Sequence, residues 1–537
     1  MSTLQAAIPA YGMPVPEGPV NKPEKVNMMP GGPMPEGGPG GPGGPGGPGG
    51  PGEMPGGPGG PGGPGMPGGP VELKPCPPTC RPSEHPGSVP GADVEPGMPG
   101  PGMPGGGPPK SPPFPRMESI DVLDGKVYVA ENPYAEITGE ITDTAMTGAT
   151  YTTDEVCLNG IYLSGETSYA IKDSKFDLTG YGIDDFAGNG SAIMADGNAK
   201  VELENTEVTT HGVIRPCTVA TGNSTLVVRN CVLDSRGGEI PASYVPRVAS
   251  GMMQPPPGLN LGGNCRTHLS MGNSRAYFYD SKILAHSWAA LSTDSSHGDL
   301  YLEANNCDVV CETVGYGTYA DNGCHNVLNN CRISVDTHVA IIAGDAWVKL
   351  NNCTVKSNRY GCMLHGVRGH YTEVTEGHIT GGDWDVADAL FFVKSENVWL
   401  KLDGAKVKTG RYLIHSILND DDAHTAVPPE MVCKVYGVNA VISNGQYEGD
   451  IVHEDPDRTC NVSFINASLN GVITDTYISL QNSTWYATGD STVCLVGETA
   501  AASIDAPAGV TISAKAGEGC SLSGEYALAS GGRLTVA

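Results

Sequence analysis

The chain has 537 residues, a formal net charge of −28 and 17% charged residues. This acidic balance excludes an extended basic surface, so neither nucleic acid nor an anionic membrane is an expected partner. The sequence has no run of about 18 apolar residues, so no membrane span is expected. The N-terminal residues lack the basic start and apolar stretch of a secretory signal. A cytoplasmic protein, bacterial in origin and with reduced cysteines, is the simplest interpretation.

Residues 1–115 are rich in Gly, Pro and Met and contain too few large apolar residues to form a core. The triplet Gly-Gly-Pro repeats from Gly37 to Pro51 and resumes from Gly56 to Pro70. Glycine at every third place is also the collagen pattern, but this tract is short and interrupted. We therefore predict a disordered tail that leans towards polyproline II, followed by one domain over residues 116–537.

Residues 116–150 alternate apolar and polar side chains and are predicted to be capping strands. Repeats follow from residue 150, and their clearest marker is the pair Asn-Cys. It occurs at Asn230-Cys231, Asn306-Cys307, Asn330-Cys331 and Asn352-Cys353, with a degenerate copy at Asp280-Ser281. The last two steps are 330−306 = 24 and 352−330 = 22 residues. A period in the twenties with short β-branched runs indicates a solenoid whose coils stack in register. Asn at one phase can then form a ladder along the axis, with Cys filling a narrow interior turn below it. Residues 497–537 read as short closing strands.

This pattern resembles the right-handed parallel β-helix superfamily, the pectate-lyase-like solenoids with internal asparagine ladders. The resemblance covers roughly residues 120–500 and implies an all-β fold. The superfamily includes lyases, hydrolases, epimerases and adhesins, so the fold does not fix a reaction. The catalytic motifs of its polygalacturonase-like and pectate-lyase members do not appear in full, and no catalytic residue is transferred from them.

Two insertions, residues 237–268 and 419–435, interrupt the period. Long loops on a repeat scaffold often border the binding face, so both are candidate walls or lids. An extended turn at residues 181–190 places Asp184 beside Asp185; we interpret it as a solvated loop in preference to a calcium site.

One strand in each repeat ends in a polar residue, and these residues fall at similar phase on successive coils. They are Asp294, Asp321, Asp345, His365, Lys394 and His415. Adjacent coils lie about 4.8 Å apart, so the six would form one ionisable stripe if the register holds. Ten of the thirteen histidines lie between His268 and His424, which also favours a site on the middle coils.

Basic and aromatic residues accompany the stripe and are candidate substrate contacts. The basic ones are Arg359, Arg368 and His370; the aromatic ones are Tyr316, Tyr319, Trp288 and Tyr360. Local basicity suits an anionic substrate or intermediate.

Three reaction classes fit these residues. Proton abstraction by His365 or Lys394, with Tyr360 as acid and an arginine as anchor, would give a lyase or isomerase. Paired aspartates would give a glycoside hydrolase, and three aspartates on Ca²⁺ a metal-assisted elimination. The resemblance implies a uronate-containing saccharide, and another small metabolite with an acidic C–H fits equally. The alternative class is a non-catalytic carbohydrate-binding or structural solenoid. The oligomeric state is open.

Overall fold

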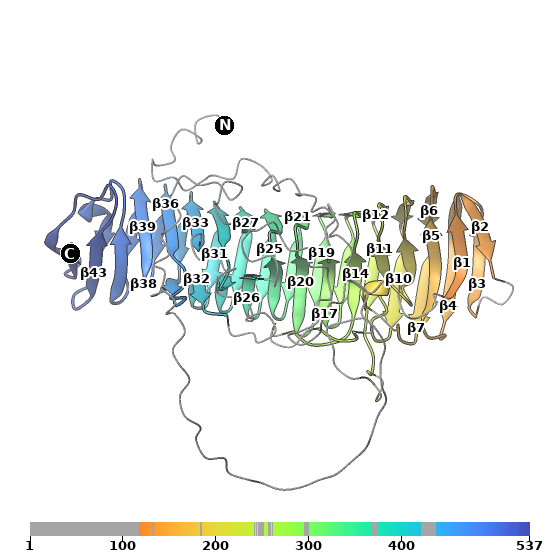
Figure 1. Cartoon of the computed structure of the whole chain (residues 1–537). Helices are drawn as coiled ribbons and strands as arrows, with labels where there is room; N and C mark the ends of the chain where they lie inside the picture. The colour runs from red at the N-terminus through yellow and green to blue at the C-terminus, as the bar shows by residue number, and fades with distance from the viewer. Residues whose placement is uncertain are drawn as a thin grey trace, which may run out of the picture.

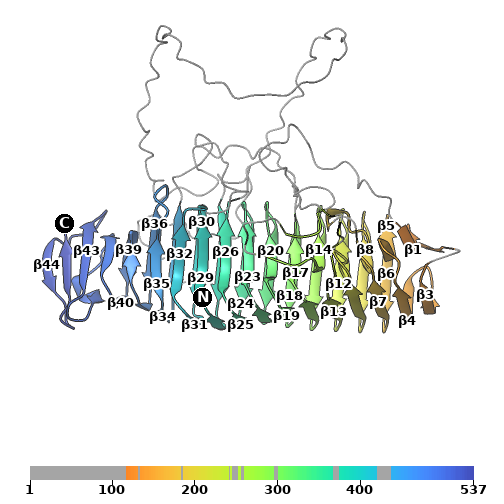
Figure 2. The same cartoon turned by 90° about the horizontal axis from the view of Figure 1, so that it is seen from below.

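The computed structural model describes residues 117–130, 134–182, 185–240, 242, 244, 252–255, 259, 261–294, 300–366, 374–419 and 437–537. The tail predicted over residues 1–115 lies outside the described residues. The rest is built almost entirely from short strands stacked along one axis (Figures 1 and 2). Each coil contributes one strand to each of three long faces, which we call faces A, B and C. The predicted parallel β-helix is therefore confirmed.

Face A is the 14-stranded sheet, and its neighbours from β5 onwards are parallel. Its strands are β2 (Lys126–Val129), β1 (Met117–Leu123), β5 (Leu158–Ser164), β8 (Ile193–Ala195), β11 (Thr218–Ala220), β14 (Arg266–Ser270), β17 (Trp288–Thr293), β20 (Gly315–Ala320), β23 (His338–Ala343), β26 (Tyr360–His365), β29 (Ala389–Lys394), β32 (Tyr412–Ile417), β35 (Asp450–His453) and β38 (Ile473–Thr474).

Face B follows face A in each coil. Its strands are β6 (Ser168–Lys172), β9 (Lys200–Glu204), β12 (Thr225–Arg229), β15 (Arg275–Tyr279), β18 (Tyr301–Asn305), β21 (His325–Asn329), β24 (Trp347–Asn351), β27 (Thr375–Thr380), β30 (Val398–Asp403), β33 (Val438–Ser443), β36 (Cys460–Ile465), β39 (Thr476–Gln481), β41 (Ser491–Leu495), β43 (Thr511–Ala516) and β45 (Arg533–Val536).

Face C completes the coil. Its strands are β7 (Lys175–Thr179), β10 (Glu207–His211), β13 (Val232–Ser235), β16 (Lys282–Ala285), β19 (Asp308–Cys311), β22 (Arg332–Val335), β25 (Thr354–Ser357), β28 (Asp383–Val386) and β31 (Lys406–Thr409). Beside β31 the face continues as a separate sheet of β34 (Gln446–Glu448), β37 (Ser468–Asn470), β40 (Thr484–Tyr486) and β42 (Ile504–Asp505).

The Asn-Cys pairs form the turn between faces B and C. Asn230, Asn306, Asn330 and Asn352 all have φ between 51° and 54°, the left-handed conformation that Asn tolerates better than most residues. Asn230 Nδ2 donates to Asn205 Oδ1 at 2.7 Å, and Asn330 Nδ2 to Asn306 Oδ1 at 3.5 Å. The asparagine ladder is present, but it lies on the exposed side of the turn and is not the internal ladder that the resemblance implies.

The cysteines behind these asparagines are buried and stacked, as predicted. Arg332 N donates to Cys307 O and Thr354 N to Cys331 O, so Cys307, Cys331 and Cys353 occupy the same place in successive coils. They join a core of Val, Ile, Leu and Ala that runs along the inside of the solenoid. Small side chains are needed here because the chain turns sharply around them.

Antiparallel strands close both ends, where the sequence predicts caps. At the N-terminal end β1 pairs with β2, and β3 (Glu136–Ile141) with β4 (Ala145–Thr153). At the other end β44 (Gly524–Ala527) pairs with β45. These hairpins cover the first and last coils, whose edges would otherwise be open for pairing.

The insertion predicted over residues 237–268 ends earlier than expected, because β14 already begins at Arg266. Its described part contributes Met252, Met253 and Leu259, which are buried in an apolar cluster with Trp288 and Tyr316 on the outer side of face A. This insertion is therefore a wall of that face. Of the second predicted insertion, all but Asn419 lies outside the described residues.

Candidate active site

The outer side of face A is covered, although its side chains point away from the solenoid core. Apolar residues of these strands fall into two separate clusters, one inside the solenoid and one outside it. Because the strands are in register, the outward residues form rows across the coils. Three such rows carry the functional candidates.

Row one lies where the strands begin, row two near their middle and row three at their ends. Row one is Arg266, Ala289, Tyr316, His338, Tyr360, Ala389 and Tyr412. Row two is Ser292, Tyr319, Ile341, Met363, Phe392 and His415. Row three is Asp294, Asp321, Ala343, His365, Lys394 and Ile417, the first two directly following the paired residues Thr293 and Ala320.

Row three contains four of the six residues of the predicted stripe. Asp345 is not in it: β23 ends at Ala343, which takes that place, and Asp345 lies in the following turn with φ 57°. His415 pairs with Phe392 and so belongs to row two, because β32 begins at Tyr412. Both residues fall outside their predicted positions because the turns between the Asn-Cys pairs and these strands differ in length from coil to coil.

Row three runs from acids to bases. Asp294 and Asp321 are 6% and 5% exposed, and His365 and Lys394 are 2% and 1% exposed. Ala343 separates the two halves and is also fully buried. At about 4.8 Å per coil, the Cα atoms of Asp321 and His365 are roughly 10 Å apart, with only a methyl group between them.

Arg266 anchors the acidic half. Its Nη1 contacts Asp294 Oδ2 at 2.5 Å, and its Nη2 contacts Asp185 Oδ2 at 2.8 Å. The guanidinium lies over the Trp288 ring at 4.5 Å. Burial alone would lower the pKa of Arg266, but the carboxylates outweigh it and raise that pKa above its ordinary value. Arg266 is therefore a permanent cation and Asp294 its counter-ion.

Asp185, which the sequence suggested would be solvated, is buried beneath this network. It belongs to the short 3-10 helix η3 (Asp185–Ala187), in the extended turn before β8. Its partner Asp184 lies outside the described residues. The part of the chain that the structure describes holds no group of three or more His, Cys, Asp or Glu side chains placed to bind a metal ion.

Hydroxyl groups continue the network. Tyr316 Oη is 3.4 Å from Arg266 Nη1 and 2.9 Å from Ser292 Oγ. Tyr319 donates to Asp321 Oδ2 at 3.1 Å. Burial raises the pKa of both tyrosines, so both hydroxyls keep their protons. Trp288 and Tyr316, predicted as open walls for substrate, are instead 1% exposed and pack within the network.

Trp288 is held in an unusual backbone conformation, with φ 66°. The left-handed region is unfavourable for a bulky aromatic residue and costs about 1–3 kcal/mol. The stacking of Trp288 on Arg266 fixes the indole in this position, and such strain is concentrated at functional sites.

His338 lies in row one between Tyr316 and Tyr360, and no pattern in the sequence distinguishes it as a site residue. It is fully buried, and neither ring nitrogen has a hydrogen-bond partner among the described residues. Burial, with Arg359 and Lys394 nearby, lowers the pKa of His338 to about 3. Its imidazole is therefore neutral at physiological pH, with a donor and an acceptor unused.

Aromatic rings border the basic half. Phe392 stacks on Tyr360, with ring centroids 4.6 Å apart and planes at 7°. His415 stacks on Tyr412 at 4.1 Å, and its Nε2 lies 3.1 Å from Glu454. Arg359 is exposed and lies over the Tyr360 ring at 4.8 Å. Arg368 and His370, predicted as further basic contacts, lie outside the described residues.

Tyr360 cannot serve as the acid partner of His365. The two residues occupy opposite ends of β26, five residues apart, which is about 16 Å along the strand. Tyr360 is placed to form a wall of the site.

Comparison of the chain with protein-family models, with curated proteins and with solved structures finds no match. Among the described residues, no helix has the length and apolar character needed to cross a bilayer.

Proposed function

We propose that the covered outer side of face A is an active site for acid–base chemistry of the lyase or isomerase type. The observation that carries the proposal is the pair His365 and Lys394, neighbours in row three that are both buried outside the solenoid core. A structural role would not require two nitrogen bases side by side on this face. A buried pair of that kind is suited to move a proton.

The side chains of His365 and Lys394 are suited to different roles. His365 Nδ1 lies 3.2 Å from Gly366 O, which orients the ring. A neutral His365 can take the proton from a carbon next to a carboxylate or carbonyl. The Lys394 ammonium, one coil away, can stabilise the negative charge that then develops on the substrate oxygen. The small Ala343 side chain lies between Asp321 and His365 in row three, and we place the reacting carbon beside it.

The acidic half favours this reaction over glycoside hydrolysis. A glycosidase needs one of its two carboxyl groups protonated at the start. Asp294 is held by the permanent cation Arg266, and Asp321 accepts a hydrogen bond from Tyr319. Each of these carboxylate oxygens is already engaged by a neighbouring side chain, so we do not assign either residue as the acid. We assign these aspartates to orienting hydroxyl groups of the substrate.

The substrate class is a uronate-type saccharide or another small metabolite with an acidic C–H. Lys394 and the exposed Arg359 supply positive charge near the basic half, in a chain that is otherwise strongly acidic. The stacked rings of Tyr360 and Phe392 supply a flat apolar wall. Positive charge beside an aromatic wall fits a sugar acid.

Solvent exchange tests the proposal without knowledge of the substrate. The purified full chain is incubated in deuterated water with a panel of uronate oligosaccharides and small carboxylates. Mass spectrometry follows both deuterium incorporation and the unsaturated products of elimination. His365→Gln and Lys394→Met should each lower incorporation about 10²–10⁴-fold. His286→Gln and Lys408→Met are matched controls, since these side chains are 50% and 79% exposed on other parts of the solenoid.

A second variant tests the space beside the base. Ala343→Phe places a bulky ring between Asp321 and His365 and should abolish the reaction while leaving His365 and Lys394 in place. If no compound in the panel gains deuterium or undergoes elimination, or the variants react as fast as the wild type, the proposal is wrong. Tight saccharide binding without any exchange would point to the non-catalytic alternative.

A further inference from the structure

Face C changes character near its C-terminal end. On the preceding coils its outward residues form ion pairs between neighbouring strands. Arg332 pairs with Asp308 at 2.6 Å, and Lys408 with Asp385 at 3.1 Å. The sheet β34–β37–β40–β42 carries amides, hydroxyls and carboxylates instead. The stabilising cross-strand pairs stop where this sheet begins.

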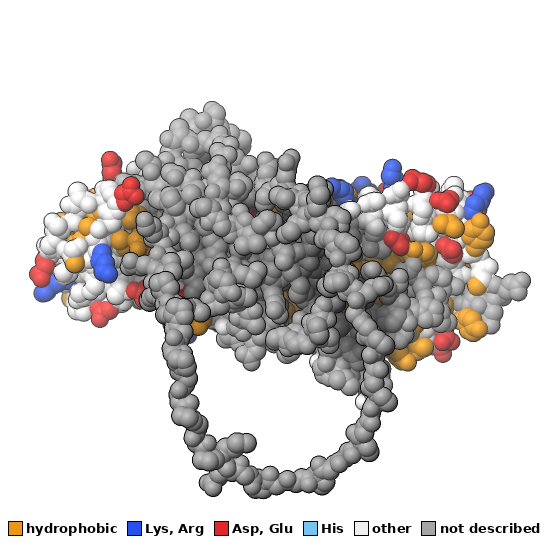
Figure 3. Space-filling model, viewed as in Figure 1, with side chains coloured by type: hydrophobic (Ala, Val, Ile, Leu, Met, Phe, Trp, Pro, Cys, Tyr) orange, Lys and Arg blue, Asp and Glu red, His pale blue; other side chains and the backbone are white. Residues whose placement is uncertain are grey.

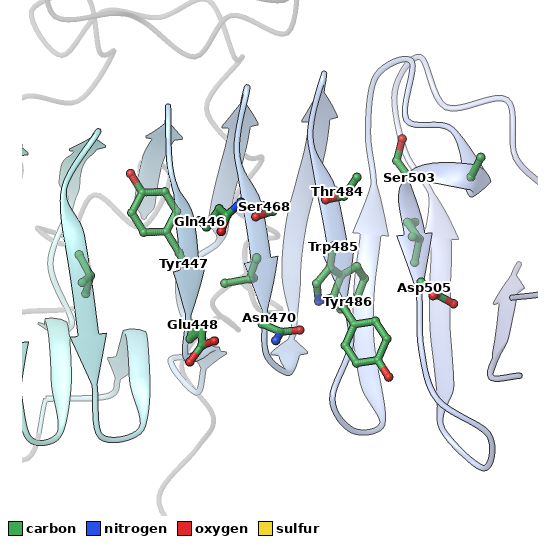
Figure 4. Close-up of a pocket in the computed structure, with 14 residues that line it drawn as sticks. Gln446, Tyr447, Glu448, Ser468, Asn470, Thr484, Trp485, Tyr486, Ser503 and Asp505 are labelled. Atoms are coloured by element: carbon green, nitrogen blue, oxygen red, sulfur yellow. The ribbon is translucent and has the colours of Figure 1, made fainter. Parts of the chain in front are cut away.

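This sheet forms the floor of an open groove of about 610 Å³. Figure 4 shows its outward side chains in two rows across the strands. One row is Gln446, Ser468 and Thr484, with Ser503 beyond; the other is Glu448, Asn470, Tyr486 and Asp505. Residues between them, such as Trp485 and Leu469, are buried and support the floor from within the solenoid.

The polar groups of this groove are not used by the fold. Among the described residues, no protein hydrogen bond or ion pair engages the side chains of Gln446, Glu448, Asn470 and Tyr486. Asp505 differs, because it accepts hydrogen bonds from the Ser530 hydroxyl at 2.7 Å and the Ser530 N–H at 2.9 Å. These bonds lower its pKa and keep Asp505 ionised. The groove therefore offers free amide donors and acceptors, a phenol ring and fixed negative charge.

The charged residues that line the groove indicate which class of ligand it can bind. Among its residues are two carboxylates, Glu448 and Asp505, and neither Lys nor Arg. Anionic ligands are therefore repelled. The carboxylates stand on the first and last strands, three coils or about 14 Å apart, which is too far to share one cation. An extended ligand with many hydroxyl groups fits both the length and the spacing of the donors.

We infer that this groove is a binding site for an oligosaccharide of neutral or amino sugars, separate from the site on face A. Asn470 and Gln446, each one residue from the centre of its strand, contact successive sugar hydroxyls. The Tyr486 ring packs against a sugar face. Glu448 and Asp505 accept hydrogen bonds from hydroxyl or ammonium groups at the two ends. The site lies on a different face from the proposed acid–base centre and does not depend on it.

Binding of the full chain to a glycan array, followed by calorimetry on the best ligand, tests the inference. Neutral or amino-sugar oligosaccharides should bind, and uronate oligosaccharides should not bind in this groove. Tyr486→Ala and Asn470→Ala should each weaken binding about tenfold. Tyr477→Ala is the matched control, because Tyr477 is a 39% exposed tyrosine on face B that does not line the groove.

The experiments distinguish failure of the groove inference from failure of the acid–base proposal for face A. His365→Gln removes the base on face A and should leave glycan binding in the groove unchanged. The inference is overturned if no neutral or amino-sugar oligosaccharide binds, or if binding survives both groove substitutions. A folded state with unchanged melting temperature is required of each variant, and the conservative change Tyr486→Phe should keep most of the affinity.

Discussion

Replacing Arg266 by methionine should destabilise the protein strongly, because it leaves two buried carboxylates without their cation. The side chains of Arg266, Asp185 and Asp294 are 5%, 2% and 7% exposed. Removing one partner of a buried ion pair costs about 3–5 kcal/mol. Here one guanidinium serves two acids, so we expect the upper part of that range.

The loss should depend on pH in a defined direction. In Arg266→Met the two carboxylates are buried charges at neutral pH, and protonation is the way to remove that charge. The variant should therefore recover part of its stability as the pH falls from 7.5 to 5. Urea unfolding at both pH values measures this as a shift of the midpoint at constant slope.

Two further variants isolate the electrostatic cause. Adding Asp185→Asn and Asp294→Asn to Arg266→Met should recover most of the loss, because no buried charge remains. Arg332→Met removes an exposed arginine that pairs with Asp308 through two contacts of 2.6 and 2.7 Å, and it should change nothing measurable. A loss below about 1 kcal/mol for Arg266→Met, or an equal loss at both pH values, would refute the reasoning.

Three other predictions concern the scaffold and its buried groups. Asn230→Ala should cost about 1–2 kcal/mol and Asn230→Gly less, because φ is 51° and alanine is strained there; equal losses in urea unfolding would contradict this. Burial raises the pKa of Cys362 and of Cys460 to about 12, so neither should react with iodoacetamide at pH 8 until urea is added, as peptide mass spectrometry can check. His338 has a folded pKa of about 3, below its unfolded value of about 6.5, so the unfolded chain binds the extra proton and stability falls as pH drops through that window. His338→Phe should flatten this slope in thermal unfolding at pH 7 and 4.5, and an unchanged slope would show that His338 does not cause it.

The scaffold could be predicted from the sequence because small residues recur at the same position in successive coils. Asn at a left-handed turn and Cys in the bend behind it recur at Asn306-Cys307, Asn330-Cys331 and Asn352-Cys353. These requirements are local and sterically strict, so the pattern survives coils of different length. The same phase predicts that Asp294, Asp321, His365 and Lys394 share a row.

The remaining residues of the site could not be located from the repeat period alone. Arg266 lies at the end of a segment without a repeat, so its position at the start of β14 could not be counted from the ladder. His338 begins its strand, whereas the predicted stripe consists of residues at the ends of strands. Asp345 and His415 shifted because the turn lengths differ between coils. Charge pairing such as Arg266 with Asp185 joins residues 81 positions apart, and only the folded coil brings them together.

Because the coils are stacked, the distance between Asp321 and His365 is a multiple of the spacing between neighbouring coils. Removing residues 330–351 would excise a single turn of the solenoid, because Asn329 and Asn351 occupy the same place in neighbouring strands. The asparagine and cysteine columns would close up in register, and the acidic and basic halves would become direct neighbours. Gain or loss of complete turns is thus a way for this architecture to change the spacing between the two halves of row three in fixed increments, with the register of the remaining coils preserved.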